Sequence, residues 1–141
     1  MAVLLYDNEN YSNVLNCLKC SNNVKEQIKN LVSGIKYTFT DKESVKLFLH
    51  QCDITDYFED LLNILETQNI ETSKLLSYFN EISINNECYR IKDLKINGND
   101  LLNIGIKNEN IGKTLKFLLK EVIKDNSKNS KDALIKLTES M

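Results

Sequence analysis

The 141-residue sequence contains no proline and no tryptophan, and it has only four glycines, one histidine and one arginine. Without proline, the commonest helix breaker is missing, so helices can end only at capping residues or glycines. No apolar run approaches the roughly 20 residues that a membrane-spanning helix needs. The opening "MAVLLY" is too short for the apolar core of a secretory signal. We therefore expect a soluble, cytoplasmic, helical protein with no membrane partner.

Few side chains of this sequence could carry out catalysis. His50, the one histidine, closes an amphipathic segment and is more typical of a surface residue than of a general base. The acidic residues Asp53 and Asp56, and the neighbours Glu59 and Asp60, do not form pairs at metal-binding spacing, and adjacent residues of a helix point apart. The sequence therefore predicts no catalytic residue, no metal ligand and no cofactor in this chain. It favours a role other than that of an enzyme.

Four cysteines allow two interpretations. Cys17 and Cys20 form a C-L-K-C pair, which His50 and Cys52 could complete into a four-ligand zinc set. However, the pair falls in a helical pattern, whereas structural zinc sites use ligand pairs on tight turns. Free, mostly buried thiols in a reducing compartment, with Cys88 as the fourth, are the favoured interpretation.

The stretch "GIKNENIGKTLKFLL", residues 105–119, contains the letters "GKT", which look like the end of a phosphate-binding loop. Walker A chemistry needs G-x-x-x-x-G-K-[ST], because a loop of that length wraps its N–H groups around a phosphate. Here six residues separate Gly105 from Gly112, and Lys107 stands where the first glycine should be. The sequence therefore argues against a nucleotide-binding P-loop.

Charge is distributed unevenly along the chain. Residues 1–89 carry 7 Lys against 13 Asp and Glu, a net charge of −6, whereas residues 90–141 carry 11 Lys and Arg against 7 Asp and Glu, a net charge of +4. A basic final third suggests a polyanionic partner. The alternative is that these lysines merely solvate helix faces.

Apolar spacing predicts helices over nearly the whole chain and an all-α fold. The predicted fold is an elongated array of helices with a compact C-terminal helical unit, divided into residues 1–87 and 88–141. Helix ends are predicted from capping patterns and glycines at Asn23 with Glu26, Thr40 with Glu43, Ser130, and Gly34 as a stop. The predicted buried residues are Val14, Leu15, Leu18, Val24, Ile28, Leu31, Val32, Val45, Phe48, Leu49, Tyr57 or Phe58, Leu61, Leu62, Leu65, Leu75, Leu76, Phe79, Ile82, Leu101, Ile106, Ile111, Leu115, Leu118, Leu119 and Val122.

A helix that starts near Asn110 or Ile111 would leave its first N–H groups free and carry a partial positive charge there. Such a helix end suits a phosphate, including one of a nucleic-acid backbone. The alternative is structural: Gly105 caps the preceding helix, Gly112 permits close packing, and the lysines are solvated. The candidate RNA-binding residues are Lys107, Asn108, Asn110, Lys113, Lys116 and Lys120.

The segment "CYRIKDLKINGNDLLNIGIKNENIGKTLKFLLKEVIKDN" resembles the C-terminal region of bacterial CCA-adding tRNA nucleotidyltransferases and their poly(A) polymerase relatives. That family shows L-x-I-N-G-x-D-L, then G-I, then I-G-x-x-L-x-x-L-L-x-x-V. The resemblance is specific over residues 88–125 and extends more weakly over the rest of the chain. The matching positions are Leu94, Ile96, Asn97, Gly98, Asp100, Leu101, Gly105, Ile106, Ile111, Gly112, Leu115, Leu118, Leu119 and Val122.

The departures from the family concern its catalytic head. The G-G-x-x-R stretch, the acidic D-x-D pair and the HD-type metal ligands are missing, and the E-D-x-x-R motif is echoed only by "EDLLN", where Asn63 replaces the arginine. The resemblance implies a body (1–87) and tail (88–141) that bind tRNA and position its 3′ end. The nucleotide addition, with its Mg²⁺, would belong to a head that is absent from this chain.

A helical protein-interaction module similar to SAM domains is the alternative from another class. SAM domains also place "DLL", then "LGI", then a glycine-containing start to a long final helix. They normally carry an extra helix between these pieces, whereas "DLL" here runs directly into "NIGI". Self-association without RNA binding would favour this alternative, and the sequence leaves the oligomeric state open.

Overall fold

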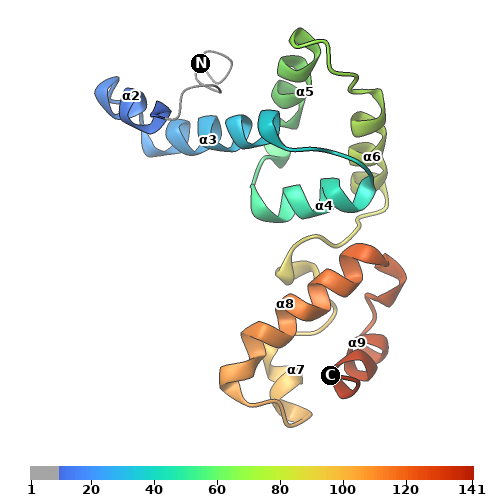
Figure 1. The fold of residues 1–141 in the computed structure, drawn as a ribbon. Helices are drawn as coiled ribbons and strands as arrows, with labels where there is room; N and C mark the ends of the chain where they lie inside the picture. Colours follow the sequence, from blue (N-terminus) through green and yellow to red (C-terminus); the bar gives the residue numbers. More distant parts are fainter. Residues whose placement is uncertain (1–9) are drawn as a thin grey trace. The chain divides into compact units, whose positions relative to one another are not determined.

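A computed structural model describes residues 10–141 (Figure 1). These residues form eight α-helices, three short 3₁₀ turns and no strand, which confirms the all-α prediction. The chain divides into two compact units between Asn80 and Glu81, within α6. No helix of the described part is long and apolar enough to span a membrane. The elements are α2 (Tyr11–Cys17), α3 (Asn22–Lys36), α4 (Lys42–Gln51), η1 (Thr55–Tyr57), α5 (Phe58–Thr67), α6 (Ser73–Ile84), η2 (Ile91–Asp93), α7 (Gly98–Asn103), α8 (Asn108–Lys124), η3 (Asn126–Lys128) and α9 (Lys131–Glu139).

Two helices of the amino-terminal unit begin at other caps than the sequence pattern predicted. Ser21 caps α3, and Asp41 caps α4 in a reciprocal box with Ser44. Both capping residues have an extended backbone, which lets a short side-chain oxygen reach the free N–H groups of the first turn. The predicted cap Asn23 lies inside α3, and Thr40 only donates its N–H to Ser44 Oγ. The pattern therefore located each start within one or two residues, but named the wrong side chain.

The sequence predicted that Gly34 ends α3, but the helix continues to Lys36. The glycine is buried where α3 packs on α5. A Cβ atom at this position would lie 2.8 Å from both Leu61 Cδ atoms and 3.1 Å from Phe48 Cζ. Gly34 is therefore a packing residue that lets these two helices approach closely.

Aromatic rings fill much of the amino-terminal core. Phe58 stacks on Phe79 with ring centroids 4.0 Å apart. Tyr37, Phe39 and Phe48 form a second group with centroids 4.9–5.2 Å apart. The sequence left open whether Tyr57 or Phe58 is the core residue; Phe58 is buried and Tyr57 is half-buried. The other buried apolar residues are Leu15, Ile28, Val32, Ile35, Val45, Leu49, Ile54, Leu61, Leu62, Leu65 and Leu75.

Six predicted core residues of this unit are less buried than expected, among them Phe79, which is half-buried. Leu18, Val24 and Leu76 are exposed at 55%, 39% and 41% of their surface. Leu18 lies just beyond the end of α2, and Val24 lies in the first turn of α3, so each is near a helix end where few neighbours cover it. Val14 and Leu31 are half-buried.

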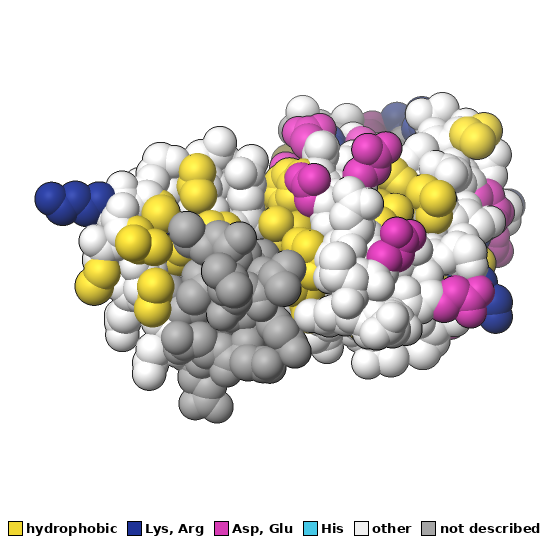
Figure 2. Space-filling view, turned by 90° about the horizontal axis from the view of Figure 1, so that it is seen from above, with side chains coloured by type: hydrophobic (Ala, Val, Ile, Leu, Met, Phe, Trp, Pro, Cys, Tyr) yellow, Lys and Arg dark blue, Asp and Glu magenta, His cyan; other side chains and the backbone are white. Residues whose placement is uncertain are grey.

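Acidic side chains dominate the exposed surface of α5 and the segment that follows it. Glu59, Asp60, Glu66 and Glu71 are all exposed. Figure 2 shows several acidic side chains and few lysines on the face that it views. This surface would repel a polyanion, so a nucleic-acid contact is better sought in the second unit.

The cysteines are not mostly buried, contrary to the sequence prediction. Cys88 is buried, Cys20 and Cys52 are half-buried, and Cys17 is exposed. Burial raises the pKa of the Cys52 thiol above 9.0, although nearby Lys29 acts in the opposite direction. Among residues 10–141, no three His, Cys, Asp or Glu side chains gather in a group that could hold a metal ion.

In the carboxyl-terminal unit, α7 and α9 pack against the long helix α8 (Figure 1). Leu101 and Leu119 are buried as predicted, but Ile106, Ile111 and Leu115 are only half-buried. A Cβ on Gly98 would lie 3.3 Å from Ile111, so α7 packs near the start of α8. Because α7 has only six residues, it covers this end incompletely. The buried apolar residues are Ile82, Cys88, Leu94, Ile96, Leu101, Leu118, Leu119, Val122, Ile123 and Leu134.

Polar side chains also hold this unit together. Asn97 and Asp100 form a capping box at the start of α7. Asp100 Oδ1 also accepts from Lys131 Nζ at 2.6 Å, which ties α7 to α9. Ser130 caps α9, as the sequence predicted. Several of these helix ends are therefore fixed by short side-chain contacts.

Candidate nucleic-acid interface

The turn between α7 and α8 contains Gly105, which lies just past the end of α7. Gly105 has φ of +92°, in the left-handed region that glycine adopts without strain. Its N–H donates to the Leu102 carbonyl at 2.9 Å, and the Ile106 N–H donates to the Leu101 carbonyl at 3.0 Å. This pair of hydrogen bonds is a Schellman motif. The prediction that Gly105 caps the preceding helix is confirmed.

The helix α8 begins at Asn108, two or three residues before the predicted start. Lys107 has an extended backbone and acts as the N-cap, although its side chain caps no N–H group. Its carbonyl already accepts from the Asn110 N–H at 2.9 Å, which closes the first turn. Asn108 and Asn110 therefore lie inside the helix. Glu109, also in this turn, places a negative charge beside the helix N-terminus.

The structural interpretation of the sequence suggested that Gly112 permits close helix packing, but no neighbour packs against it. It is exposed, and a Cβ atom there would meet nothing within 4 Å. The face of α8 that carries Gly112 is thus open to solvent.

Three of the predicted lysines share one exposed face of α8. Lys113, Lys116 and Lys120 are separated by three and four residues, so their side chains project from the same side of the helix. At 1.5 Å per residue, the face runs for about 10 Å along the axis. We call these three residues the lysine face. It is brought together by the helix, without any contact between distant segments.

The other predicted residues lie around the lysine face. Lys107 is exposed and sits at the amino end of the helix. At about 100° per residue, Asn108 and Asn110 lie roughly 90° or more around the helix from the centre of the lysine face. Both are exposed. The six predicted residues therefore extend from the amino end of α8 along most of its length, but only the three lysines form a single surface.

A comparison with known protein families identifies the chain. The family described as tRNA nucleotidyltransferase domain 2 matches residues 1–138. The chain belongs to this family. No curated protein and no solved structure matched the sequence. The match confirms the resemblance to the C-terminal region of tRNA nucleotidyltransferases.

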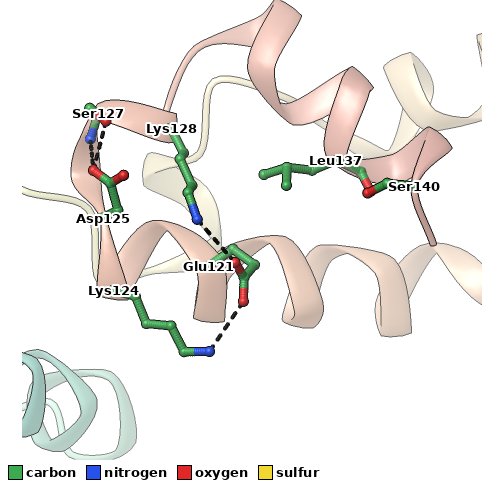
Figure 3. A network of polar contacts seen from close by, with 7 residues as sticks. All are labelled: Glu121, Lys124, Asp125, Ser127, Lys128, Leu137 and Ser140. Carbon is green, nitrogen blue, oxygen red and sulfur yellow. Dashed lines mark hydrogen bonds and ion pairs between the residues drawn. The ribbon is translucent and has the colours of Figure 1, made fainter.

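In this member of the tRNA nucleotidyltransferase domain 2 family, the lysine face ends at a group of ion pairs (Figure 3). Glu121 accepts from Lys124 Nζ at 3.2 Å and from Lys128 Nζ at 3.1 Å. These hydrogen bonds, that from Lys128 first, hold the pKa of the Glu121 carboxyl below its usual value. Figure 3 shows both lysines turned toward Glu121. Lys124 continues the spacing of the lysine face, but its charge is engaged within the protein.

A second basic group was not among the predicted site residues. Arg90, Lys92 and Lys95 line a pocket of about 540 Å³ within the carboxyl-terminal unit, beside Tyr89. These residues follow no helical period, so helical spacing could not group them. The available signal was composition alone: "YRIKDLK" places one aromatic ring among three cations.

Proposed function

We propose that this chain is the tRNA-contacting region of a tRNA nucleotidyltransferase, which holds its substrate through backbone phosphates while a separate catalytic head adds nucleotides to the 3′ end. The lysine face of α8, in a chain of this family, is the observation that carries the proposal. Whether the head adds CCA, part of it, or poly(A) is decided outside these residues. On this proposal the protein works in the cytoplasm, where its tRNA substrate is found.

Lysine side chains suit this role because they neutralise phosphates without reading bases. Each phosphate that a lysine contacts releases condensed counterions, which gives affinity that falls with salt and depends little on sequence. The amino end of α8, with Lys107, adds a partial positive charge to the same region. Glu109 weakens this end, so the lysine face carries most of the proposed contact.

Catalytic chemistry would remain with the head. Nucleotidyl transfer of this kind needs carboxylates that hold metal ions. Among residues 10–141, no three His, Cys, Asp or Glu side chains gather into a group that could hold a metal ion. The contribution of this chain would be to bind and orient tRNA.

Fluorescence anisotropy of a labelled, folded tRNA tests the proposal. We expect the triple variant Lys113→Ala, Lys116→Ala, Lys120→Ala to bind more weakly than wild type. The slope of log K against log salt should also become shallower, by at most about 0.9 for each phosphate that the variant no longer neutralises. The matched control is Lys29→Ala, Lys36→Ala, Lys74→Ala, which changes net charge equally by removing exposed lysines of the amino-terminal unit.

Equal affinity and equal slope in wild type and the α8 variant would contradict the proposal. An equal loss of affinity in both triple variants would attribute binding to total charge, and would contradict the lysine face as well. Sedimentation of the same samples addresses the SAM-like alternative, since self-association together with no tRNA binding would favour an interaction module.

A further inference from the structure

The loop between α6 and α7 concentrates positive charge around the pocket of about 540 Å³. Arg90, Lys92 and Lys95 contribute three cations, against the carboxylates of Glu87 and Asp93. Lys92 and Lys95 are exposed, and both lie on or next to η2. The pocket therefore has a net positive lining within the basic unit of the chain.

Side chains of the α8–α9 connection hold this loop in place. The Cys88 N–H donates to Asn126 Oδ1 at 3.0 Å, and the Lys95 N–H donates to Asn129 Oδ1 at 2.9 Å. Asn129 also donates its Nδ2 to the Asp93 carbonyl at 3.1 Å. The loop is thus fixed near both ends by hydrogen bonds. A ligand would meet a preorganised surface, which lowers the entropy cost of binding.

Three buried residues of the same loop also fix it to the core of the unit. Cys88 is 1% exposed, and Leu94 and Ile96 are 8% and 3% exposed. With these residues turned into the core, the polar residues between them line the pocket. Tyr89 and Arg90 lie at its wall, with the guanidinium carbon 5.1 Å from the centre of the tyrosine ring. This contact places a positive charge over an aromatic face.

We propose that this pocket binds one unpaired nucleotide of an RNA strand, with its base stacked against Tyr89 and its phosphate held by Lys92 and Lys95. Aromatic rings beside cations are the usual means of holding single-stranded bases and their backbone. The volume falls within the range of about 300–1,000 Å³ that small ligands occupy. An acidic peptide would use the cations but not the ring. The inference rests on the proposed function only in taking RNA as the partner.

The test uses a labelled single-stranded RNA hexamer without base pairing, titrated into the full chain and followed by anisotropy. We expect Tyr89→Ala to weaken binding about 5- to 150-fold, the effect of removing one stacked base, and Tyr89→Phe to preserve it. Lys92→Ala with Lys95→Ala should lower the salt slope by about 1.4 for two single-strand phosphates. Lys29→Ala with Lys36→Ala is the charge-matched control. Circular dichroism should show the same helix content for all variants.

Amide chemical shifts locate the bound hexamer independently of the variants. Shifts confined to residues 87–95 and 126–129 support the pocket, and shifts confined to α8 overturn it. No hexamer binding, or equal binding by wild type, Tyr89→Ala and the lysine pair variant, also overturns it. So does an equal dependence of hexamer and acidic-peptide binding on Lys92 and Lys95 with no dependence on Tyr89.

The two proposals fail separately. If folded tRNA binds through the lysine face but the hexamer does not bind, the pocket inference fails and the proposed function stands. If the hexamer binds at Tyr89 while the lysine-face variant binds tRNA like wild type, the lysine face fails and the pocket stands.

Discussion

The two units of this chain differ in charge. Residues up to Asn80 contain 7 Lys against 11 Asp and Glu, a net charge of −4, whereas residues 81–141 contain 11 Lys and Arg against 9 Asp and Glu, a net charge of +2. Both candidate RNA surfaces, the lysine face of α8 and the pocket beside Tyr89, lie in the second unit. On the proposed function, nucleic-acid contact would fall to the second unit, while the acidic first unit would repel a polyanion.

The two units also differ in the contacts that stabilise them. The amino-terminal unit packs aromatic rings, such as Phe58 on Phe79, and a glycine that brings α3 and α5 close. The carboxyl-terminal unit combines an aliphatic core along α8 with polar ties such as the one from Lys131 to Asp100. The first unit should therefore be sensitive to side-chain volume, and the second to volume in its core and to pH at its surface.

The largest expected effect tests the aliphatic core of the second unit. Leu118 is 0% exposed, so Leu118→Ala should cost roughly 2–5 kcal/mol of unfolding free energy as a buried truncation. Leu115 was predicted from the sequence to be buried, but it is half-buried, so Leu115→Ala should cost only about 1–2 kcal/mol. Urea denaturation of the two variants measures the difference. An equal loss of stability would mean that both side chains belong to one core.

Two glycines provide the next comparison, one from each unit. Gly34→Ala inserts a methyl group 2.8 Å from the buried Leu61 side chain, and should destabilise the protein by about 1–3 kcal/mol through overpacking. Gly112→Ala meets open space in the interior of α8, and should stabilise it by about 1 kcal/mol because alanine favours the helix. Thermal melting gives opposite shifts if the packing of the two units is as described. Two shifts of the same sign would contradict it.

These glycines also show what a sequence can and cannot predict. Apolar spacing located the helices and most of the core, because a helix face repeats every 3.6 residues whatever it packs against. The role of a glycine depends on its neighbour in space, and nothing in the local sequence shows that Leu61 lies against Gly34. The sequence predicted a helix stop at Gly34, and its structural alternative for the α8 start gave Gly112 a packing role; both are wrong.

The same difference decides which residues of the candidate RNA surfaces could be predicted from the sequence. Lys113, Lys116 and Lys120 could be grouped from the sequence because their spacing follows the helix period. Arg90, Lys92 and Lys95 could not, because their loop takes its shape from Asn126 and Asn129, more than thirty residues further along the chain. The identity of a capping residue was also hidden, since Asn23 and Ser21 both have side-chain oxygens that could accept the same N–H groups.

The smallest expected effect concerns the polar ties of the second unit. Hydrogen bonds from Lys131 and from the Asn97 backbone hold the pKa of Asp100 below 3.8, and those from Lys128 and Lys124 hold the pKa of Glu121 below 4.5. A carboxyl whose pKa is lowered by folding stabilises the protein above its unfolded pKa, and loses that contribution as pH falls through the folded pKa. The melting temperature of wild type should therefore exceed that of Asp100→Asn with Glu121→Gln at pH 7. The gap should begin to close once pH falls below about 4.5 and disappear below both folded pKa values. Because both carboxylates are near the surface, added salt should narrow the gap at pH 7. A gap that persists unchanged in acid would mean that these side chains act by shape and not by charge.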